Sequence, residues 1–306
     1  MKSDSVQPRV AITILIWNGK EDTLKCLRSL REDTYGNKQI IIVDNGSTDD
    51  SVEKIRLLFP EVIVLRMGKN LGFTGGNNAG IRHALEMSVD YIYLLNNDTT
   101  VEPGALGRLV EAAEANPEAG LVAPVIHDLD PPRAIWFAGS ALSLRHAAAW
   151  HDNSHEPSLT ELPYEVPWAT GCAMLIRAEL LRELGGFDDR YFLSWEDVDL
   201  SLRVRKAGKK VMVAPMARIY HKGGQSGKNF HGIYSYYAVR NRMLLASKHS
   251  GRDYPRALLW IIYGHLKRCL HPRFTEPRFH NLSLIWQAAR DHFQEHYGQY
   301  RPASQP

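Results

Sequence analysis

Three polar residues directly follow predicted strands, where ligands bind in parallel α/β proteins. Asn18 ends the first predicted strand, Asp44 the second and Asp98 the fourth. Ligands of open α/β sheets bind beyond the carboxyl ends of the strands, so these side chains are candidates for binding or catalysis. Asp98 lies in the run 96–99, whose four side chains all carry an oxygen. Hard cations such as Mg2+ or Mn2+ prefer such ligands, whereas a lone Asp44 suits a turn equally well.

A glycine-rich segment, residues 70–80, opens a predicted helix. Glycines stand at positions 72, 75, 76 and 80. Glycine lets the backbone approach a ligand closely, and a helix N-terminus attracts anions. The segment is neither a Walker phosphate loop nor the dinucleotide pattern GxGxxG after a first strand. Its composition suits a plain flexible loop as well as a binding loop.

The densest group of acidic residues lies in the segment 187–200, with aromatic side chains beside it. Glu196 and Asp197 are predicted to begin a helix, where the helix dipole stabilises a carboxylate by about 0.3–1 kcal/mol. That structural role accounts for one acid and leaves the rest of the cluster unexplained. Asp197 and Asp199 are two residues apart, so on a helix they point to different faces and cannot share one task.

A second candidate segment, 221–227, joins His221 and Lys222 to three glycines. A single histidine is more often structural than a ligand. Here the basic, glycine-rich surroundings favour contact with a phosphate or a metal. The segment is therefore a further candidate for ligand binding.

The elements that must position these residues alternate short β-branched runs with helical patterns, which is typical of a parallel α/β sheet. Strands are predicted at 10–17, 39–43, 62–66, 91–95 and 121–125, with helices between them. Residues 128–167 are predicted to form loops or an antiparallel excursion, because prolines interrupt them. Regular structure resumes at 168–176 and in a helix at 196–207. The residues after 250 have the pattern of amphipathic helices.

Composition and charge limit the class of protein. The 306 residues are 44% hydrophobic and 23% charged, which excludes collagen-like, low-complexity and wholly disordered chains. The net charge of +3 hides an asymmetry, because residues 201–306 hold 19 Lys and Arg against 4 Asp and Glu. Such a basic segment predicts an anionic partner, which could be a nucleic acid, a phosphorylated substrate or an anionic membrane. A solvated basic face is the simpler alternative.

Cysteine usage and hydropathy indicate a cytoplasmic protein. Cys26, Cys172 and Cys269 are far apart and form no CxxC pair, so neither a disulfide framework nor a zinc site is expected. The first apolar run has no small-residue cleavage site behind it and is expected to be a buried strand, not a signal peptide. We find no apolar run near the ~20 residues that span a bilayer.

Six motifs, in this order, closely resemble those of the family-2 inverting glycosyltransferases, and within them the rhamnosyltransferase-type branch that extends polysaccharides on lipid carriers. The resemblance covers about residues 9–245. Its specificity comes from the order of the motifs, since each alone is only moderately specific. The motifs are WNG at 17–19, VDNGSTD at 43–49, NLGFTGGNN at 70–78, LNND at 95–98, GGFD at 185–188 and WEDVD at 195–199.

The resemblance implies a GT-A fold, which is a Rossmann-like, mixed and mostly parallel α/β sheet with a helical C-terminal extension. Residues 1–250 would form the glycosyltransferase domain, and residues 251–306 an extension associated with the acceptor or the membrane. It also implies a nucleotide-diphosphate sugar donor and a divalent metal, Mg2+ or Mn2+.

The resemblance also implies a role for individual residues. Asp44 corresponds to the residue that contacts the nucleobase, and Asp197 to the general base. Asp98 corresponds to the last residue of the DxD-type motif that holds metal and diphosphate, and His221 to a further metal or phosphate contact. Further donor contacts are expected from Trp17, Asn18, Asn45, Lys69, Gly75, Gly76, Asn77, Asn97 and Trp195. Acceptor or phosphate contacts are expected from Glu196, Lys222 and Arg240.

Two positions depart from the pattern of many family members. Asn96 replaces the first carboxylate of the DxD-type motif, so the phosphates of the donor must compensate more of the metal's charge. Asn77 stands where many members carry Arg, which leaves the diphosphate charge to Lys69, Lys222 or Arg240. We interpret both as markers of a subtype.

The expected reaction is a single displacement with inversion. A carboxylate that takes the proton of the attacking hydroxyl contributes roughly 10²–10⁴-fold, and holding donor and acceptor in line contributes further. The best expectation is transfer of rhamnose from dTDP-rhamnose to a glycan or a polyprenyl-diphosphate-linked acceptor. Transfer of galactofuranose, glucose or N-acetylglucosamine from UDP is the alternative within the family. An inert nucleotide- or glycan-binding subunit is less favoured because both Asp98 and Asp197 are present.

The basic C-terminal helices, at 236–242 and 257–270, have two possible uses. Basic helices with apolar faces can lie on an anionic membrane, each Lys or Arg contributing about 1 kcal/mol, and a polyprenyl-linked acceptor would be found there. Packing in the protein core is an equally good expectation. Nucleic-acid binding ranks last, because we recognise no such motif. The protein is thus expected in the cytoplasm, peripheral to the inner face of the cytoplasmic membrane.

Overall fold

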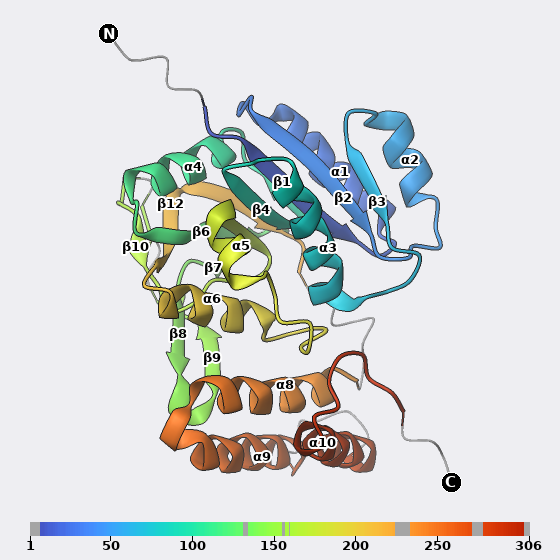
Figure 1. The fold of residues 1–306 in the computed structure, drawn as a ribbon, viewed down its shortest axis with the longest axis vertical. Coiled ribbons are helices and arrows are strands. Elements are labelled where there is room, and N and C mark those ends of the chain that lie inside the picture. The colour runs from blue at the N-terminus through green and yellow to red at the C-terminus, as the bar shows by residue number, and fades with distance from the viewer. Residues whose placement is uncertain are drawn as a thin grey trace.

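The computed structural model describes residues 7–130, 134–154, 157–158, 160–223, 233–270 and 278–302, with the backbone alone at 268–270 and 278–281. Its centre is a ten-stranded mixed sheet (Figure 1). The main path of this sheet follows the order β10 (Tyr164–Glu165), β12 (Lys210–His221), β6 (Ala119–Asp128), β11 (Ala173–Arg177), β4 (Tyr91–Asn96), β1 (Val10–Ile16), β2 (Lys38–Asp44) and β3 (Ile63–Arg66).

The N-terminal half of the sheet is parallel, as predicted. Strand β1 pairs in parallel with β2 and with β4, and β2 pairs in parallel with β3. These strands are continuous apolar runs because helices cover both faces of such a sheet. The covering helices include α1 (Lys20–Glu32), α2 (Ser51–Leu58), α3 (Gly72–Glu86) and α4 (Ala105–Ala115). The carboxyl ends of β1, β2 and β4 therefore meet at one edge.

Glycines bring α3 close to the sheet. A Cβ at Gly76 would lie 2.3 Å from a methyl carbon of Leu15, and one at Gly80 would lie 3.0 Å from Val43. The sequence predicted that these glycines let the backbone approach a ligand. At Gly76 and Gly80 the structure shows a close approach to strands β1 and β2.

The second half of the sheet is where the structure differs most from the prediction. The regular segment predicted at 168–176 is a shorter strand, β11, which pairs antiparallel with β4 and β6. The sequence pattern missed β12, a twelve-residue strand. Its register against β6 shifts between Ala214 and Arg218. This irregularity, beside Pro215, breaks the alternation that would have revealed the strand.

The segment 128–167 contains the antiparallel excursion that its prolines suggested. Strand β7 (Ile135–Phe137) pairs with β6, and β8 (Ser140–Ser143) pairs with β9 (Ala148–His151) as a separate two-stranded sheet. A further short strand, β5 (Thr99–Val101), pairs antiparallel with the end of β12.

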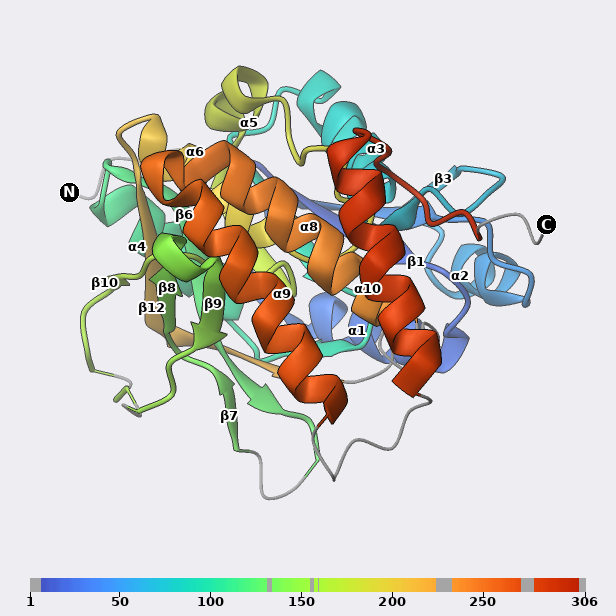
Figure 2. The same cartoon turned by 90° about the horizontal axis from the view of Figure 1, so that it is seen from below.

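Three helices form a layer at one end of the molecule: α8 (Ile233–His249), α9 (Tyr254–Leu270) and α10 (Arg278–Phe293). Figures 1 and 2 show α8 nearest the sheet domain, with α9 and α10 on its outer side. Side chains of all three share one apolar cluster, which includes Tyr237, Met243, Ile261 and Leu284. The helical layer thus begins at α8. Across the described chain, no helix combines the length and the apolar character needed to cross a membrane.

Candidate active site

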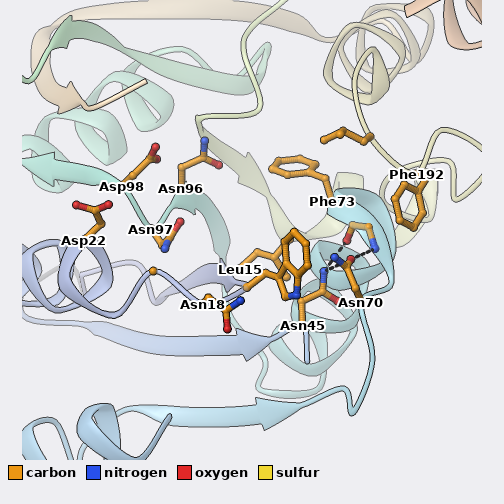
Figure 3. A pocket seen from close by; sticks show the side chains of 14 residues that line it. Leu15, Asn18, Asp22, Asn45, Asn70, Phe73, Asn96, Asn97, Asp98 and Phe192 are labelled. Carbon is orange, nitrogen blue, oxygen red and sulfur yellow. Dashed lines mark hydrogen bonds between the residues drawn. The ribbon is translucent and has the colours of Figure 1, made fainter. Parts of the chain in front are cut away.

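A cavity of about 530 Å³ opens at the edge where β1, β2 and β4 end (Figure 3). Asp22 and Asp98 lie at one end of it, and Phe73 and Phe192 at the other. Five residues predicted from the sequence are in its wall: Trp17, Asn18, Asn45, Asn97 and Asp98. The remaining lining residues are Leu15, Gly19, Asp22, Asn70, Gly72, Phe73, Asn96, Phe192 and Leu193.

Asparagine side chains fix the turns that follow β1 and β2. The Oδ1 atom of Asn18 accepts a hydrogen bond from the Thr48 amide at 2.8 Å. Asn45 accepts one from the Leu71 amide at 2.8 Å, and its amide group donates to Asn70 and to the Gly72 carbonyl (Figure 3). These bonds join the ends of two strands to the start of α3. The cavity wall at this end is therefore preformed.

Asp44 is enclosed beneath this wall. It is 1% exposed, and its Oδ1 atom accepts a hydrogen bond from the Ser47 amide at 2.8 Å. Its Oδ2 atom lies 3.5 Å from Nε of Arg66. In the structure Asp44 therefore stabilises a turn, which is one of the roles that the sequence allowed. It lies outside the described cavity lining.

Asp98 and His221 meet at the other end of the cavity. Because β5 pairs with β12 so that Thr99 lies opposite His221, the imidazole comes beside the carboxylate. The His221 Nε2 atom lies 3.1 Å from Asp98 Oδ1, and both side chains are about nine-tenths buried. The buried Nδ1 atom of His221 has no hydrogen-bond partner among the described residues. Asp98 and His221 are thus two predicted site residues that lie in direct contact in the structure.

The pair fits a divalent cation. Its carboxylate oxygen suits both Mg2+ and Mn2+ when phosphates complete the coordination, whereas its imidazole nitrogen suits a transition-metal ion such as Mn2+ better than Mg2+. Within the described part of the chain, no three His, Cys, Asp or Glu residues converge in a way that could hold a metal. The protein would therefore contribute few ligands, and the substrate the others.

Lys222 continues the strand beyond His221 and reaches the same end of the cavity. Its Nζ atom lies 2.9 Å from both carboxylate oxygens of Asp22, a lining residue that the sequence analysis missed. The available signal was an acid in the first turn of the helix that follows Asn18. The glycines at 224 and 227 predicted to accompany Lys222 lie outside the described residues.

Asp197 is near the opposite end, at the start of α6 (Glu196–Lys206). Its carboxylate accepts hydrogen bonds from the amides of Gly171 at 3.0 Å and Val198 at 2.8 Å. A Cβ at Gly171 would lie 3.2 Å from the Phe73 ring, and Phe73 lines the cavity. Burial raises the pKa of Asp197, while these two amides favour its ionised form. Asp197 retains some exposed surface.

Glu196 has the opposite environment to its neighbour. It is 5% exposed, and its Oε2 atom has no hydrogen-bond partner in the described chain. Burial and the adjacent Asp197 charge raise its pKa well above the usual carboxyl range. Of the two carboxyl groups, Asp197 is therefore the one that ionises more readily.

Asp199 faces away from Asp197, as the two-residue spacing predicted. It is fully buried, and it accepts hydrogen bonds from Arg203 and His249, both at 2.8 Å. Lys248 lies 2.5 Å away. Asp199 thus joins α6 to the end of α8.

The loop that leads into α6 has an unusual backbone. Phe192, Ser194 and Trp195 have φ values of 63°, 72° and 74°, a region that L-residues rarely adopt. The side-chain amide of Asn241 donates hydrogen bonds to three carbonyls, those of Tyr191, Leu193 and Ser194. From the other side, the Phe73 amide donates to the Phe192 carbonyl at 2.7 Å.

Arg240 donates hydrogen bonds to the same loop and does not face a phosphate site. It is fully buried, and it donates to the carbonyls of Arg190, Tyr191 and Gly298. The predicted phosphate contact is therefore corrected: the guanidinium has no exposed surface for a ligand. The sequence showed a basic helix but not the loop carbonyls that face it.

The other predicted donor contacts lie outside the described cavity lining. Gly75, Gly76 and Asn77 are inside α3, and the Asn77 amide donates to the Phe73 carbonyl. Trp195 packs with Trp168 and Val198, and the Arg242 guanidinium lies 5.5 Å from its ring. Lys69 is exposed on the loop before α3. Their predicted contacts with a ligand stay predictions.

Comparison with known proteins gives a consistent result. A model of the family described as Glycosyl transferase family 2 matches residues 11–185. The chain is 29% identical over 281 residues to N-acetylglucosaminyl-diphospho-decaprenol L-rhamnosyltransferase of Mycobacterium tuberculosis (strain CDC 1551 / Oshkosh), which covers 85% of this chain and 90% of that protein.

Solved structures share the fold. GalNAc-T7 with UDP, GalNAc and Mn2+ has a TM-score of 0.61 at 16% identity, over 88% of this chain and 59% of that one. Mannosyltransferase PcManGT from Pyrobaculum calidifontis, in complex with GDP-Man and Mn2+, has a TM-score of 0.58 at 15% identity, over 95% and 88%. The predicted GT-A fold, a mostly parallel mixed sheet with C-terminal helices, is thereby confirmed.

Proposed function

Because the chain belongs to glycosyl transferase family 2, we propose that this glycosyltransferase moves rhamnose from dTDP-rhamnose to a hydroxyl of a polyprenyl-diphosphate-linked glycan, with inversion. The observation that carries the proposal is the cavity with Asp98 and His221 at one end and Asp197 behind Phe73 at the other. Similarity over most of the chain to a mycobacterial rhamnosyltransferase supports the choice of sugar and acceptor.

The diphosphate of the donor would bind near Asp98, His221 and Lys222. Asp98 and His221 would hold Mg2+ or Mn2+, with the carboxylate as the ligand that suits either ion and the imidazole favouring Mn2+. When bound, such an ion offsets the negative charge that develops on the leaving diphosphate. Lys222, now paired with Asp22, would supply a further positive charge. The nucleoside would lie toward Trp17, Asn18 and Asn45.

Asp197 would act as the general base. Its ionised carboxylate is held by the Gly171 and Val198 amides, and it would take the proton from the acceptor hydroxyl as that oxygen attacks the sugar. Glu196 is buried and its pKa is raised by burial and by the Asp197 charge, so it is not proposed as a second base. A reaction with one base and no protein nucleophile is a single displacement, which inverts the anomeric carbon.

The proposed partners follow from this chemistry. The donor and the acceptor both carry phosphates, which suits the basic final third of the chain. A lipid-linked acceptor would bring the enzyme to the inner face of the cytoplasmic membrane, as a peripheral protein engaged in cell-surface polysaccharide synthesis. Nucleic acid has no part in the proposal.

Thermal unfolding with nucleotide sugars tests the proposal. A ligand at about 100 times its Kd stabilises a protein by about 2.7 kcal/mol, so dTDP-rhamnose with Mg2+ or Mn2+ should raise the Tm. Asp98→Asn should lose the metal-dependent part of this shift. The matched control, Asp50→Asn, changes an exposed carboxylate paired with Lys20 and should keep it.

Other outcomes would contradict parts of the proposal. A shift with UDP-sugars alone would change the donor to galactofuranose, glucose or N-acetylglucosamine and keep the reaction class. If no nucleotide sugar raises the Tm, the proposed transfer fails, and a catalytically inert glycan-binding subunit becomes the better interpretation.

A further inference from the structure

Helices α9 and α10 lie on the side of α8 that faces away from the sheet domain (Figures 1 and 2), and they carry large exposed apolar side chains. Leu259 on α9 is 74% exposed, and Trp286 on α10 is 73% exposed. The opposite sides of the two helices are buried in their common core, at Ile261 and Leu284 for example. We call the outer surface the α9–α10 face, formed by Leu259, Trp260, Tyr263, Leu266, Trp286 and Phe293.

The same face is basic. Arg256 and Lys267 are exposed, and their spacing from Trp260 and Tyr263 sets all four side chains on one stripe of α9. The sequence of α9 has no acid. Among the described side chains of α10 the acid is Asp291, which is buried and lies 3.1 Å from Arg290.

We propose that the α9–α10 face docks on the surface of an anionic lipid bilayer. Helices with Trp, Phe and Leu on one side and Lys or Arg beside them lie in the membrane interface, where apolar burial and attraction to anionic lipids add together. Aromatic side chains are favoured at that depth. A second copy of the chain fits less well, because two such faces would bring like charges together.

Docking in this orientation brings the cavity close to the bilayer. The Phe192 ring, which lines the cavity, stacks on Tyr237 of α8 with ring centroids 5.6 Å apart. Helix α8 in turn packs against α9 and α10 through the shared apolar cluster. One layer of helix therefore separates the cavity wall from the docked face. The inference rests on the proposed function only in that a lipid-linked acceptor gives the docking a purpose.

Vesicle flotation with the full chain tests the proposal. The protein should float with vesicles of equal parts phosphatidylcholine and phosphatidylglycerol, and added salt should weaken the binding. The double variant Leu259→Glu/Trp286→Glu should bind at least about tenfold more weakly, since it removes apolar contact and adds negative charge. The matched control is Leu57→Glu/Leu162→Glu, whose side chains are 71% and 81% exposed outside this face. It should bind like the wild type.

Two results would overturn the proposal. One is unchanged flotation of the Leu259→Glu/Trp286→Glu variant. The other is a wild type that fails to float; if it also forms a dimer by light scattering that this variant abolishes, the face belongs to a second copy. Transfer to a water-soluble short-chain acceptor should be equal in variant and wild type. Its absence from the wild type would overturn the proposed function and leave the flotation result valid.

Discussion

Glu196 and Asp197 are adjacent carboxyl groups whose surroundings differ in how well they stabilise the ionised form. Asp197 accepts two backbone hydrogen bonds, whereas one carboxyl oxygen of Glu196 is buried with no partner in the described chain. Two neighbouring carboxylates in a poorly solvated site do not both ionise. The hydrogen bonds decide in favour of Asp197, which is what a general base at this position requires.

Conservative variants of the two residues should therefore behave differently. Asp197→Asn should lower kcat at least about 100-fold with little change in the donor KM, because only proton removal is lost. Glu196→Gln removes a carboxyl group that is not proposed to take the proton and should keep kcat within about threefold. Steady-state kinetics on both variants, with urea unfolding to verify folding, is the measurement. Near-normal turnover of folded Asp197→Asn would locate the base elsewhere.

The pH dependence of the wild type provides an independent check on the same residue. Burial raises the pKa of Asp197, and only its ionised form can accept the proton. The kcat should thus rise with pH and level off once Asp197 is ionised, with a midpoint above the normal range of an exposed aspartate. An acid limb at or below the usual aspartate pKa would contradict the assignment.

At the scale of elements, helix α8 stabilises the conformation of the loop between Tyr191 and Trp195. Each non-glycine residue with positive φ costs about 1–3 kcal/mol, and this loop contains three of them. Asn241 opposes that cost with three hydrogen bonds to the loop carbonyls. The loop supplies Phe192 and Leu193 to the cavity wall, and it ends where α6 begins with Glu196 and Asp197.

We therefore expect Asn241→Ala to affect both binding and turnover. Stability should fall by about 2–3 kcal/mol through lost hydrogen bonds to buried carbonyls, the donor KM should rise and kcat should fall. The matched control is Asn116→Ala. This variant removes one side-chain amide hydrogen bond to the Ala112 carbonyl of helix α4, which is not part of this loop. Kinetics normalised to folded protein separates the two roles. If stability falls while KM and kcat stay unchanged, the role of Asn241 is purely structural.

The sequence predicts elements well where one local pattern decides them. Apolar residues dominate β1, β2 and β4, so these strands and the polar residues behind them were predictable. Strand β12 was missed because its register shift near Pro215 disrupts the pattern. The pairing of β12 with β5 brings His221 to Asp98, and 123 residues separate the two in the chain. The order of the motifs implied this contact, but the spacing of neighbouring residues did not predict it.

Arg240 and Asp22 also make contacts with distant parts of the chain that the local sequence did not predict. Arg240 was assigned to a phosphate because a basic residue on an amphipathic helix has no visible partner in the sequence. Its partners are backbone carbonyls about 50 residues earlier and 58 residues later in the chain, and the sequence does not show which backbone carbonyls a side chain will meet. Asp22 was overlooked because a first-turn acid on a helix is commonplace. Its place in the cavity depends on the packing of α1 against the sheet edge.

At the scale of the whole molecule, buried charges join the helical layer to the sheet domain. Asp199 of α6 contacts Lys248 and His249 at the end of α8, and Lys248 also lies 2.7 Å from Asp188. Burial alone would raise the pKa of Asp199. The hydrogen bond from His249 and the charges of Lys248 and Arg203 outweigh burial and lower the pKa to about 2.

This network should give the molecule a specific acid sensitivity. A carboxyl whose pKa is lower in the folded than in the unfolded state contributes stability that is complete above about pH 4, the unfolded value. That contribution is lost as the pH falls toward about 2, the folded value. Asp199→Asn should remove it at every pH and take the carboxylate partner from Arg203, while Lys248 keeps its contact with Asp188, so stability should fall by about 1.5–3 kcal/mol.

Denaturant unfolding of both proteins from pH 7 to pH 2 measures this effect. The gap between wild type and Asp199→Asn should be largest at neutral pH and should narrow below about pH 4, because protonation of Asp199 in the wild type progressively reproduces the variant. Part of the acid loss should persist in the variant, since Asp188 also has a lowered pKa through Arg190 and Lys248, against the effect of burial. A gap that does not change with pH would mean that the charge of Asp199 does not hold the two layers together.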